Sequence, residues 1–216
     1  MVQGPPGLGD QASMSYTPLE YWTRKSETYR AGHLKDEDAN FIEMVKTHLP
    51  ESPRILDVGS GLGLTYEVTK EAGIDVTNFK MCDFIKHFID RCEEAIGVRP
   101  DYWDGKTLPY EDDSFDMAVS WSVMLHIVEE EEVEAFIKEH MRVAQYLFIA
   151  TWKEEGARQH VGVHCFQHDY EGIFERLGLE VVEARPANWR GSKEKGRFRR
   201  INYLVRKKGS EDTSEE

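Results

Sequence analysis

The sequence lacks any apolar run near the roughly 18 residues that a helix needs to cross a bilayer. Its N-terminal stretch also lacks the basic and apolar regions of a secretory signal peptide. Cysteine is scarce: the three cysteines, Cys82, Cys92 and Cys165, show no C-x-x-C spacing. Disulfides and a cysteine-bound metal are therefore not expected, and we expect a cytoplasmic protein with reduced thiols and no membrane partner.

Positive charge is also in short supply, because the formal net charge is −13 at pH 7. Binding to nucleic acid depends on neutralising phosphates with lysine and arginine, so this charge argues against a nucleic-acid partner. Residues 185–216 are the exception, with ten basic and five acidic side chains. These basic residues could form a solvated strand and loop, or a patch for a substrate that bears phosphate or carboxylate.

The chain of 216 residues is long enough to bury the core of one α/β domain. From residue 54 onward, apolar runs alternate with segments in which apolar residues recur at helical spacing. This alternation predicts a doubly wound, mostly parallel sheet with helices on both faces. The last two strands have no helix between them, which predicts an antiparallel hairpin at one edge. The expected strands are 54–59, 76–82, 100–103, 115–121, 146–151, 179–184 and 201–205, and the expected helices are 36–49, 64–72, 84–96, 129–141 and 170–177.

We place a single domain at residues 16–208, between flexible tails at 1–15 and 209–216. Within the domain we expect an N-terminal cap, a ligand-binding core, and a substrate loop followed by the C-terminal hairpin, at 16–50, 54–151 and 152–208. The cap is rich in aromatic residues that could either cover a ligand or pad the edge of the sheet: Tyr16, Tyr21, Trp22 and Tyr29.

A glycine-rich turn follows the first strand, in the stretch R-I-L-D-V-G-S-G-L-G from Arg54 to Gly63. Glycine is needed where the backbone adopts positive φ or comes close to a ligand, and a side chain at Gly59 or Gly61 would block both. The turn also opens a helix, whose free N–H groups favour a polar or anionic group. The stretch therefore predicts a turn on which a ligand lies.

Ligands of such sheets bind beyond the carboxyl ends of the strands. Asp83 stands at one of these ends, 20 residues after Gly63. A carboxylate there can accept hydrogen bonds from both hydroxyls of a ribose, although an aspartate can equally cap the following helix. The other residues at predicted strand ends are Asp57, Gly59, Asp104, Ser120, Trp121, Thr151 and Trp152.

Four stretches resemble the motifs of the class I S-adenosylmethionine (SAM) dependent methyltransferases. D-V-G-S-G-L-G at 57–63 is similar to the first motif, since its third glycine comes one residue earlier than in the dinucleotide pattern G-x-G-x-x-G. C-D-F-I-K-H-F-I at 82–89 resembles the second motif, and residues 103–120 resemble the next two run together. W-S-V-M-L-H-I at 121–127 resembles the segment after the fourth strand.

The resemblance covers about residues 54–151 and implies a Rossmann-like seven-stranded sheet, mostly parallel with an antiparallel edge strand. It implies SAM as the cofactor, with Asp83 on the ribose, Phe84 beside the adenine and Asp104 receiving the adenine amino group. The acidic surroundings also suit a sulfonium cofactor better than a pyrophosphate. The expected cofactor-binding residues are Asp57, Gly59, Ser60, Gly61, Asp83, Phe84, Asp104, Gly105, Ser120 and Trp121.

The resemblance further implies transfer of a methyl group by in-line displacement to an oxygen or nitrogen atom of a soluble small-molecule acceptor. The protein then has mainly to align the reactants and, for some acceptors, to remove a proton. His126 is our candidate base because histidine titrates near neutral pH, the alternative being a hydrogen-bonded histidine under the rim of the sheet.

Other functions stay open at this point: a SAM-binding protein without catalysis, a methyltransferase for a protein or RNA acceptor, and a nicotinamide oxidoreductase. A metal site is not expected. His160, His164 and His168 have the spacing H-x3-H-x3-H, but Val161 and Gly162 between them do not suit the helix that a shared metal face needs.

Overall fold

The computed structural model describes residues 18–30, 35–153, 165–187 and 199–209. The predicted tails lie outside these ranges, apart from Gly209. Within the described ranges, no helix has both the length and the apolar character that a membrane span requires.

A single seven-stranded sheet organises the chain, in the order β3-β2-β1-β4-β5-β7-β6. Among the described strands, β7 alone runs opposite to all the others, so the predicted mostly parallel sheet with an antiparallel edge is confirmed. The antiparallel strand lies one place inside that edge, because β7 turns back and inserts between β5 and β6. The strands are β1 Ile55–Val58, β2 Phe79–Asp83, β3 Asp101–Tyr102, β4 Phe115–Trp121, β5 Ala144–Lys153, β6 Leu179–Ala187 and β7 Arg199–Lys207.

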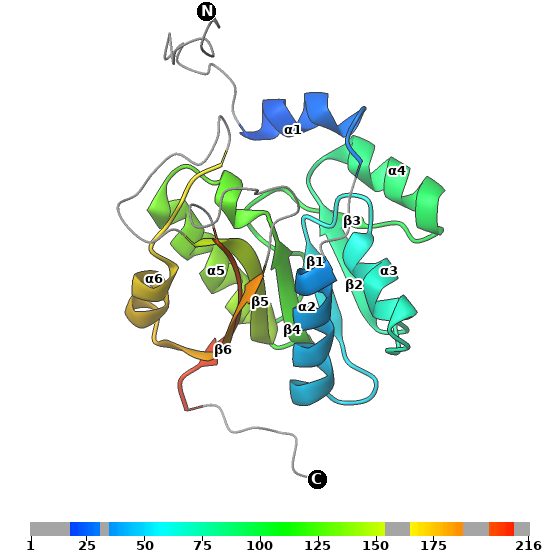
Figure 1. The fold of residues 1–216 in the computed structure, drawn as a ribbon. Coiled ribbons are helices and arrows are strands. Elements are labelled where there is room, and N and C mark those ends of the chain that lie inside the picture. The colour runs from blue at the N-terminus through cyan, green and yellow to red at the C-terminus, as the bar shows by residue number, and fades with distance from the viewer. Residues whose placement is uncertain (1–17, 31–34, 154–164, 188–198, 210–216) are drawn as a thin grey trace, which may run out of the picture.

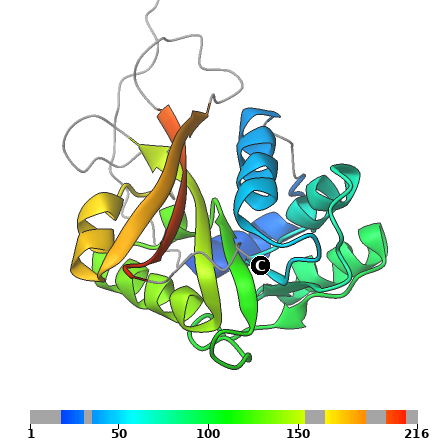
Figure 2. The ribbon, with the colours of Figure 1, turned by 90° about the horizontal axis from the view of Figure 1, so that it is seen from below.

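Helices cover both faces of the sheet, with α2, α3 and α4 on one side and α5 and α6 on the other (Figure 2). Helix α1 lies across the top of the molecule next to α4 (Figure 1), and a short 3-10 helix, η1, follows β4. The helices are α1 Pro18–Ser26, α2 Lys35–His48, α3 Leu64–Glu71, α4 Lys86–Ile96, η1 Met124–His126, α5 Glu130–Val143 and α6 Tyr170–Arg176.

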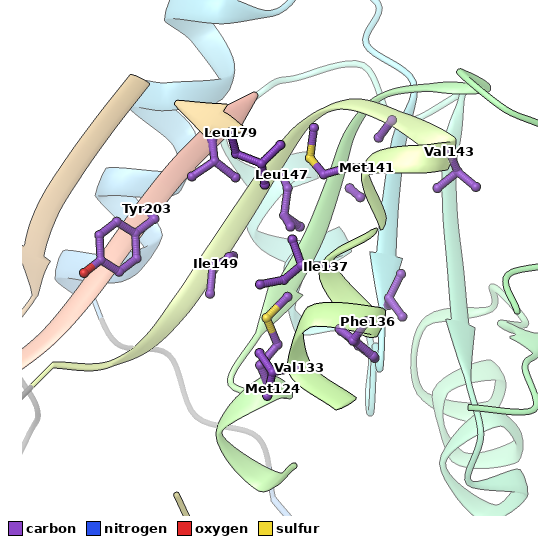
Figure 3. Packing of buried hydrophobic residues seen from close by; sticks show 14 of the residues in the cluster. Met124, Val133, Phe136, Ile137, Met141, Val143, Leu147, Ile149, Leu179 and Tyr203 are labelled. Carbon is purple, nitrogen blue, oxygen red and sulfur yellow. The ribbon is translucent and has the colours of Figure 1, made fainter. Parts of the chain in front are cut away.

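The core forms two layers, one on each face of the sheet, because the central strands are apolar on both sides. Under α5, Ile137 and Met141 pack toward Leu147 and Ile149 of β5, with Tyr203 of β7 beside them (Figure 3). Parallel strands end at one edge, so β1, β2 and β4 bring their last residues together beneath α1. That edge is where the sequence predicts the site.

Candidate functional site

The glycine turn between β1 and α3 contains three glycines with positive φ: Gly59 at 76°, Gly61 at 56° and Gly63 at 79°. A Cβ atom on Gly59 would lie 2.7 Å from Val123 Cγ2, and one on Gly63 would lie 2.9 Å from Cys92 Sγ. A Cβ on Gly61 would have no described atom within 4 Å. Gly59 and Gly63 are therefore required by packing within the chain, and Gly61 is the glycine whose backbone lies open for a ligand.

Two buried carboxylates lie beneath this turn. Asp57 is the last residue but one of β1 and Asp83 is the last residue of β2, and the two residues are 1% and 3% exposed. Asp83 Oδ2 accepts a hydrogen bond from the Gly61 N–H at 2.9 Å, and Asp83 Oδ1 accepts one from Ile85 N–H at 2.8 Å. Asp83 thus fixes the turn to the start of α4. A backbone hydrogen bond from Phe84 also reaches this carboxylate, which offers about four acceptor positions, so its structural role and the predicted ribose contact are compatible.

Burial makes both carboxyl groups weak acids. The pKa of Asp57 is raised to about 7 by desolvation, offset in part by a hydrogen bond from Thr65 and raised further by the charge of Asp83. The pKa of Asp83 is raised to about 6, again mainly by desolvation, while backbone N–H groups lower it. Two desolvated acids side by side favour a ligand that carries positive charge.

These pKa values give a stability prediction for Asp57→Asn. A carboxyl with a raised pKa binds its proton more tightly in the folded state than in the unfolded state, so its stabilising effect is present at low pH and is lost as pH rises from about 4 to about 7. We therefore expect Asp57→Asn to be more stable than the wild type by roughly 2 kcal/mol at about pH 8, with the difference shrinking toward acid pH.

Urea unfolding at a series of pH values would measure this difference. His140 titrates in the opposite sense, because burial lowers its pKa to about 4, so its stabilising effect is lost as pH falls from about 6.5 to about 4. Its effect cancels here, since both proteins contain it. A difference that did not change with pH would contradict the assignment to Asp57.

The residues predicted to surround an adenine lie on the exposed side of the site. Phe84 is half-buried, and its ring centroid is 6.2 Å from that of Trp103. Asp104 is exposed, and its Oδ1 accepts hydrogen bonds from Lys106 N–H at 2.8 Å and Thr107 N–H at 3.0 Å. These bonds lower the pKa of Asp104 and make it a turn-forming residue. Gly105, at φ 85°, has no described atom near its Cβ position.

Ser120 and Trp121 lie on opposite faces of the sheet, although both were expected to bind the cofactor. Successive residues of a strand point to opposite faces of the sheet. Ser120 is fully buried, whereas the Trp121 ring packs against Phe41 and Phe148 and its Nε1–H donates to Glu37 Oε2 at 3.1 Å. Trp121 therefore belongs to the α2 side of the sheet.

His126 ends η1 at the same edge and is half-buried. Its ring lies edge-on to Trp22 of α1, with centroids 4.8 Å apart, and its Nδ1 is 3.9 Å from Cys165 Sγ. Burial raises the pKa of the Cys165 thiol to about 11, so the thiol is protonated at neutral pH. His126 therefore faces a neutral thiol and an aromatic ring.

Two aromatic residues, Trp22 of α1 and Tyr29 just after α1, pack among residues of the site. Trp22 and Tyr29 both contact Phe88 of α4, with ring centroids 6.2 Å and 5.5 Å apart. Arg91, also on α4, donates to the carbonyl groups of Ser26 and Tyr29 and so ties the end of α1 to α4. The contacts with Phe88 and His126 put α1 over the ligand edge of the sheet. Tyr16 lies outside the described residues.

The basic hairpin is paired with acidic groups in its described part. Arg185 binds Glu43 and Glu183, Arg206 binds Glu180, and Lys207 lies 3.9 Å from Asp113. These ion pairs support the structural interpretation of the three basic residues that form them. The remaining basic residues of the cluster between 188 and 198 lie outside the described residues.

The three-histidine stretch is described only at His168, whose Nε2 lies 2.8 Å from the Ile127 carbonyl oxygen. His160 and His164 lie outside the described residues. Among the residues that the structure does describe, no group of three His, Cys, Asp or Glu side chains could hold a metal ion.

Sequence reasoning missed Glu37, Ser122 and Arg200, which meet in a buried network at this edge. Glu37 and Arg200 are 163 residues apart. Glu37 reads as an ordinary acidic residue in the first turn of a helix, and Arg200 as one member of the basic cluster, so no local pattern indicates that they pair.

The site offers buried polar atoms to a ligand. Asp57 Oδ2, Ser60 Oγ and Ser120 Oγ are buried, and none of them has a hydrogen-bond partner among the described residues. Buried polar atoms normally have partners, so unpaired ones beside an open glycine backbone indicate where a ligand would supply them. A cofactor with hydroxyl groups and a positive charge fits this set of acceptors and hydroxyls.

Residues 55–145 match the family model described as a methyltransferase domain. Among solved structures, the chain is similar to geranyl diphosphate C-methyltransferase from Streptomyces coelicolor A3(2), with 10% identity, a TM-score of 0.67, and coverage of 90% of this chain and 99% of that chain. It is also similar to magnesium protoporphyrin IX methyltransferase from Synechocystis PCC 6803, with 15% identity, a TM-score of 0.62, and coverage of 89% and 99%.

The [4+2]-cyclase SpnF is similar as well, with 16% identity, a TM-score of 0.65, and coverage of 89% of this chain and 97% of that chain. At such identities these three structures show a shared fold alone. No curated protein matches the sequence.

Proposed function

We infer that this chain is a class I SAM-dependent methyltransferase, and we propose that it transfers a methyl group from SAM to an oxygen or nitrogen atom of a soluble small molecule. The observation that carries the proposal is the pair of buried carboxylates, Asp57 and Asp83, beneath the open backbone of Gly61. Neighbouring acids of raised pKa favour a cationic ligand over a pyrophosphate, and SAM carries a sulfonium and an ammonium group.

Different residues at the carboxyl edge of the parallel strands would bind different parts of the cofactor. Asp83 would accept hydrogen bonds from the ribose through its remaining lone pairs. Asp57, Ser60 and Ser120 would provide polar partners toward the amino-acid end, where their unpaired atoms lie. The half-buried Phe84 and the exposed Asp104 and Gly105 would surround the adenine, and Trp121 would contribute from the α2 side of the sheet.

When bound, SAM supplies a methyl group on a sulfonium sulfur. This methyl group is reactive enough that no covalent intermediate with the protein is needed. The chain then has to align the acceptor and exclude water. Trp22 of α1 and Tyr29 just after α1 would exclude water, because they pack on each other over this edge and Trp22 contacts His126. His126 would accept a proton from the acceptor when that group is a hydroxyl or an ammonium.

Asp83→Asn is expected to weaken binding of S-adenosylhomocysteine about 30-fold, because one charged acceptor for hydroxyl groups is lost. Isothermal titration calorimetry with the wild type and the variant would measure the change. Circular dichroism would check that the variant is folded, since Asp83 also accepts two backbone N–H groups.

Asp90→Asn is the matched control, because Asp90 carries the same side chain on the exposed surface of α4, paired with Arg99. Its affinity for S-adenosylhomocysteine should equal that of the wild type. The proposal fails if the wild type does not bind this compound, or if Asp83→Asn binds it as well as the control does. Binding of NADH, followed by fluorescence, would instead favour an oxidoreductase.

His126→Asn is expected to slow methyl transfer about a hundredfold while leaving the affinity for S-adenosylhomocysteine within about twofold of the wild type. The pH profile of the transfer rate should also lose its acidic limb, because the titrating base is gone. An unchanged rate would leave His126 as a structural residue, the reading in which it only packs against Trp22 and Cys165.

The acceptor for this assay has to be found first, because one fold serves many acceptors. The similar structures include a C-methyltransferase and a cyclase. Incubating cell extract with isotopically labelled SAM and the purified chain, followed by mass spectrometry, would identify the labelled compound. A labelled protein or RNA would replace the small-molecule proposal, and binding without any labelled product would favour a SAM-binding protein without catalysis.

A further inference from the structure

A buried network joins α2, β4, β5 and β7 at the ligand edge. Arg200 of β7 and Glu37 of α2 have side chains that are 2% and 0% exposed, and they form an ion pair through Arg200 Nε and Glu37 Oε1. Arg200 Nη2 also donates to Glu37 Oε2 at 3.2 Å. The guanidinium carbon lies 5.1 Å from the ring centroid of Trp152, within range of a cation–π interaction.

The same arginine holds a residue in an unfavourable backbone conformation. Ser122, directly after β4, has a φ of 60°, in the left-handed region that residues other than glycine rarely adopt. Arg200 Nη2 donates to Ser122 Oγ at 2.6 Å, and the Ser122 N–H donates to the Ala150 carbonyl at 2.9 Å. Strained backbone of this kind persists only where its surroundings fix it.

The turn at Ser122 sets the direction of the segment 122–126. The next residue, Val123, fills the space above Gly59 in the glycine turn. The segment then forms η1 and ends at His126, which contacts Trp22 of α1. Val123, near the start of this segment, therefore contacts the glycine turn, and His126, at its end, is the residue proposed to face the acceptor.

We propose that Arg200, held by Glu37, is a positioning residue that keeps Ser122 in its left-handed conformation and so aligns segment 122–126 with the glycine turn. The consequence for cofactor affinity rests on the proposed function. The competing explanation is purely structural: the ion pair would attach α2 to β7 and have no particular effect on Ser122.

The variant Glu37→Gln/Arg200→Met separates the two explanations. It leaves no unpaired buried charge, and glutamine keeps an acceptor for Trp121 Nε1–H, so the fold is expected to survive. The affinity for S-adenosylhomocysteine should fall about tenfold, because Ser122 no longer has support for its strained backbone. Amide hydrogen exchange in segment 122–126 should become faster.

Adding Ser122→Gly to this double variant is expected to restore the affinity to within about threefold of the wild type, since glycine adopts positive φ without strain. A purely structural ion pair predicts no such rescue. The control Glu180→Gln/Arg206→Met removes an ion pair at the opposite end of β7 and should leave the affinity unchanged.

Ser122→Ala and Ser122→Gly alone give a second test, which does not require the buried pair to be replaced. Alanine should weaken binding about tenfold, and glycine should not. The inference is overturned if alanine and glycine behave alike, or if the double variant keeps wild-type affinity and exchange. If the wild type itself fails to bind S-adenosylhomocysteine, the proposed function fails, and exchange in segment 122–126 of the double variant still decides the positioning role.

Discussion

Glu37→Leu is expected to lower the free energy of unfolding by about 3–5 kcal/mol, measured by urea denaturation near neutral pH. The reason is that the Arg200 guanidinium, only 2% exposed, would keep its charge without a carboxylate partner. Native domains are stable by only about 5–15 kcal/mol, so this single change could remove a large part of the total. Arg200→Met should be destabilising for the corresponding reason.

The two single variants should differ in the size of their loss. A lone buried carboxyl can become neutral by binding a proton, whereas a guanidinium cannot lose one. The loss in Arg200→Met should therefore be smaller than the loss in Glu37→Leu. The double variant Glu37→Leu/Arg200→Met should recover most of the stability, because apolar residues of similar volume can replace a buried ion pair.

Arg99→Met serves as the control for these stability measurements. Arg99 pairs with Asp90 and Glu93 on the exposed surface of α4, where ion pairs contribute little, so its removal should give no measurable change. Single variants at Glu37 and Arg200 that are as stable as this control would mean that water reaches the pair.

Gly59→Ala is expected to cost about 3 kcal/mol of stability through two separate effects. The new Cβ would lie 2.7 Å from Val123 Cγ2, which forces a shift in a packed segment, and alanine would be strained at a φ of 76°. Combining it with Val123→Ala removes the close contact and leaves only the backbone strain. The double-mutant cycle should therefore show a favourable coupling of about 1–2 kcal/mol.

Gly61→Ala is the informative comparison, because Gly61 also has a positive φ but no described atom within 4 Å of its Cβ position. It should lose only about 1 kcal/mol, the strain of the left-handed backbone. Its affinity for S-adenosylhomocysteine should nevertheless fall, because the added methyl group enters the open space assigned to the cofactor. Equal stability losses at Gly59 and Gly61 would show that Val123 moves aside freely.

Much of the fold could be predicted because the signals are local. The strand at 115–121 was placed with both of its ends correct, since a continuous apolar run is typical of a strand covered on both faces. The glycine turn and Asp83 were placed at strand ends for the same reason: each lies at a change from strand to helix pattern. Ser120 and Trp121 were expected to act together, although the two-residue period of a strand already puts them on opposite faces.

The prediction of the cofactor site rested on sequence motifs. A motif does not show which residues from elsewhere in the chain pack against it. The first motif does not show that its three glycines have different surroundings. In the structure a Cβ atom on Gly59 would meet Val123 and one on Gly63 would meet Cys92, whereas the space at Gly61 is open. Asp104 was expected to bind adenine, and it also forms the turn to Thr107 through two backbone N–H groups. The basic cluster at 185–208 offered two interpretations, and the ion pairs of Arg185 and Arg206 support the structural one.

By itself the sequence determined the order of the strands and of helices α2 to α6, the glycine turn and the acids at the strand ends, because periodicity, glycine conformation and strand ends are properties of neighbouring residues. It did not indicate α1 or η1. Only the tertiary structure decided that Glu37 meets Arg200 and that Arg200 meets Ser122. Those contacts join α2, β4 and β7, and they arise because β7 reverses direction and brings its first residues to the carboxyl edge of the parallel strands. No local sequence pattern predicts these contacts, since they form only when β7 pairs with β5 in the folded sheet.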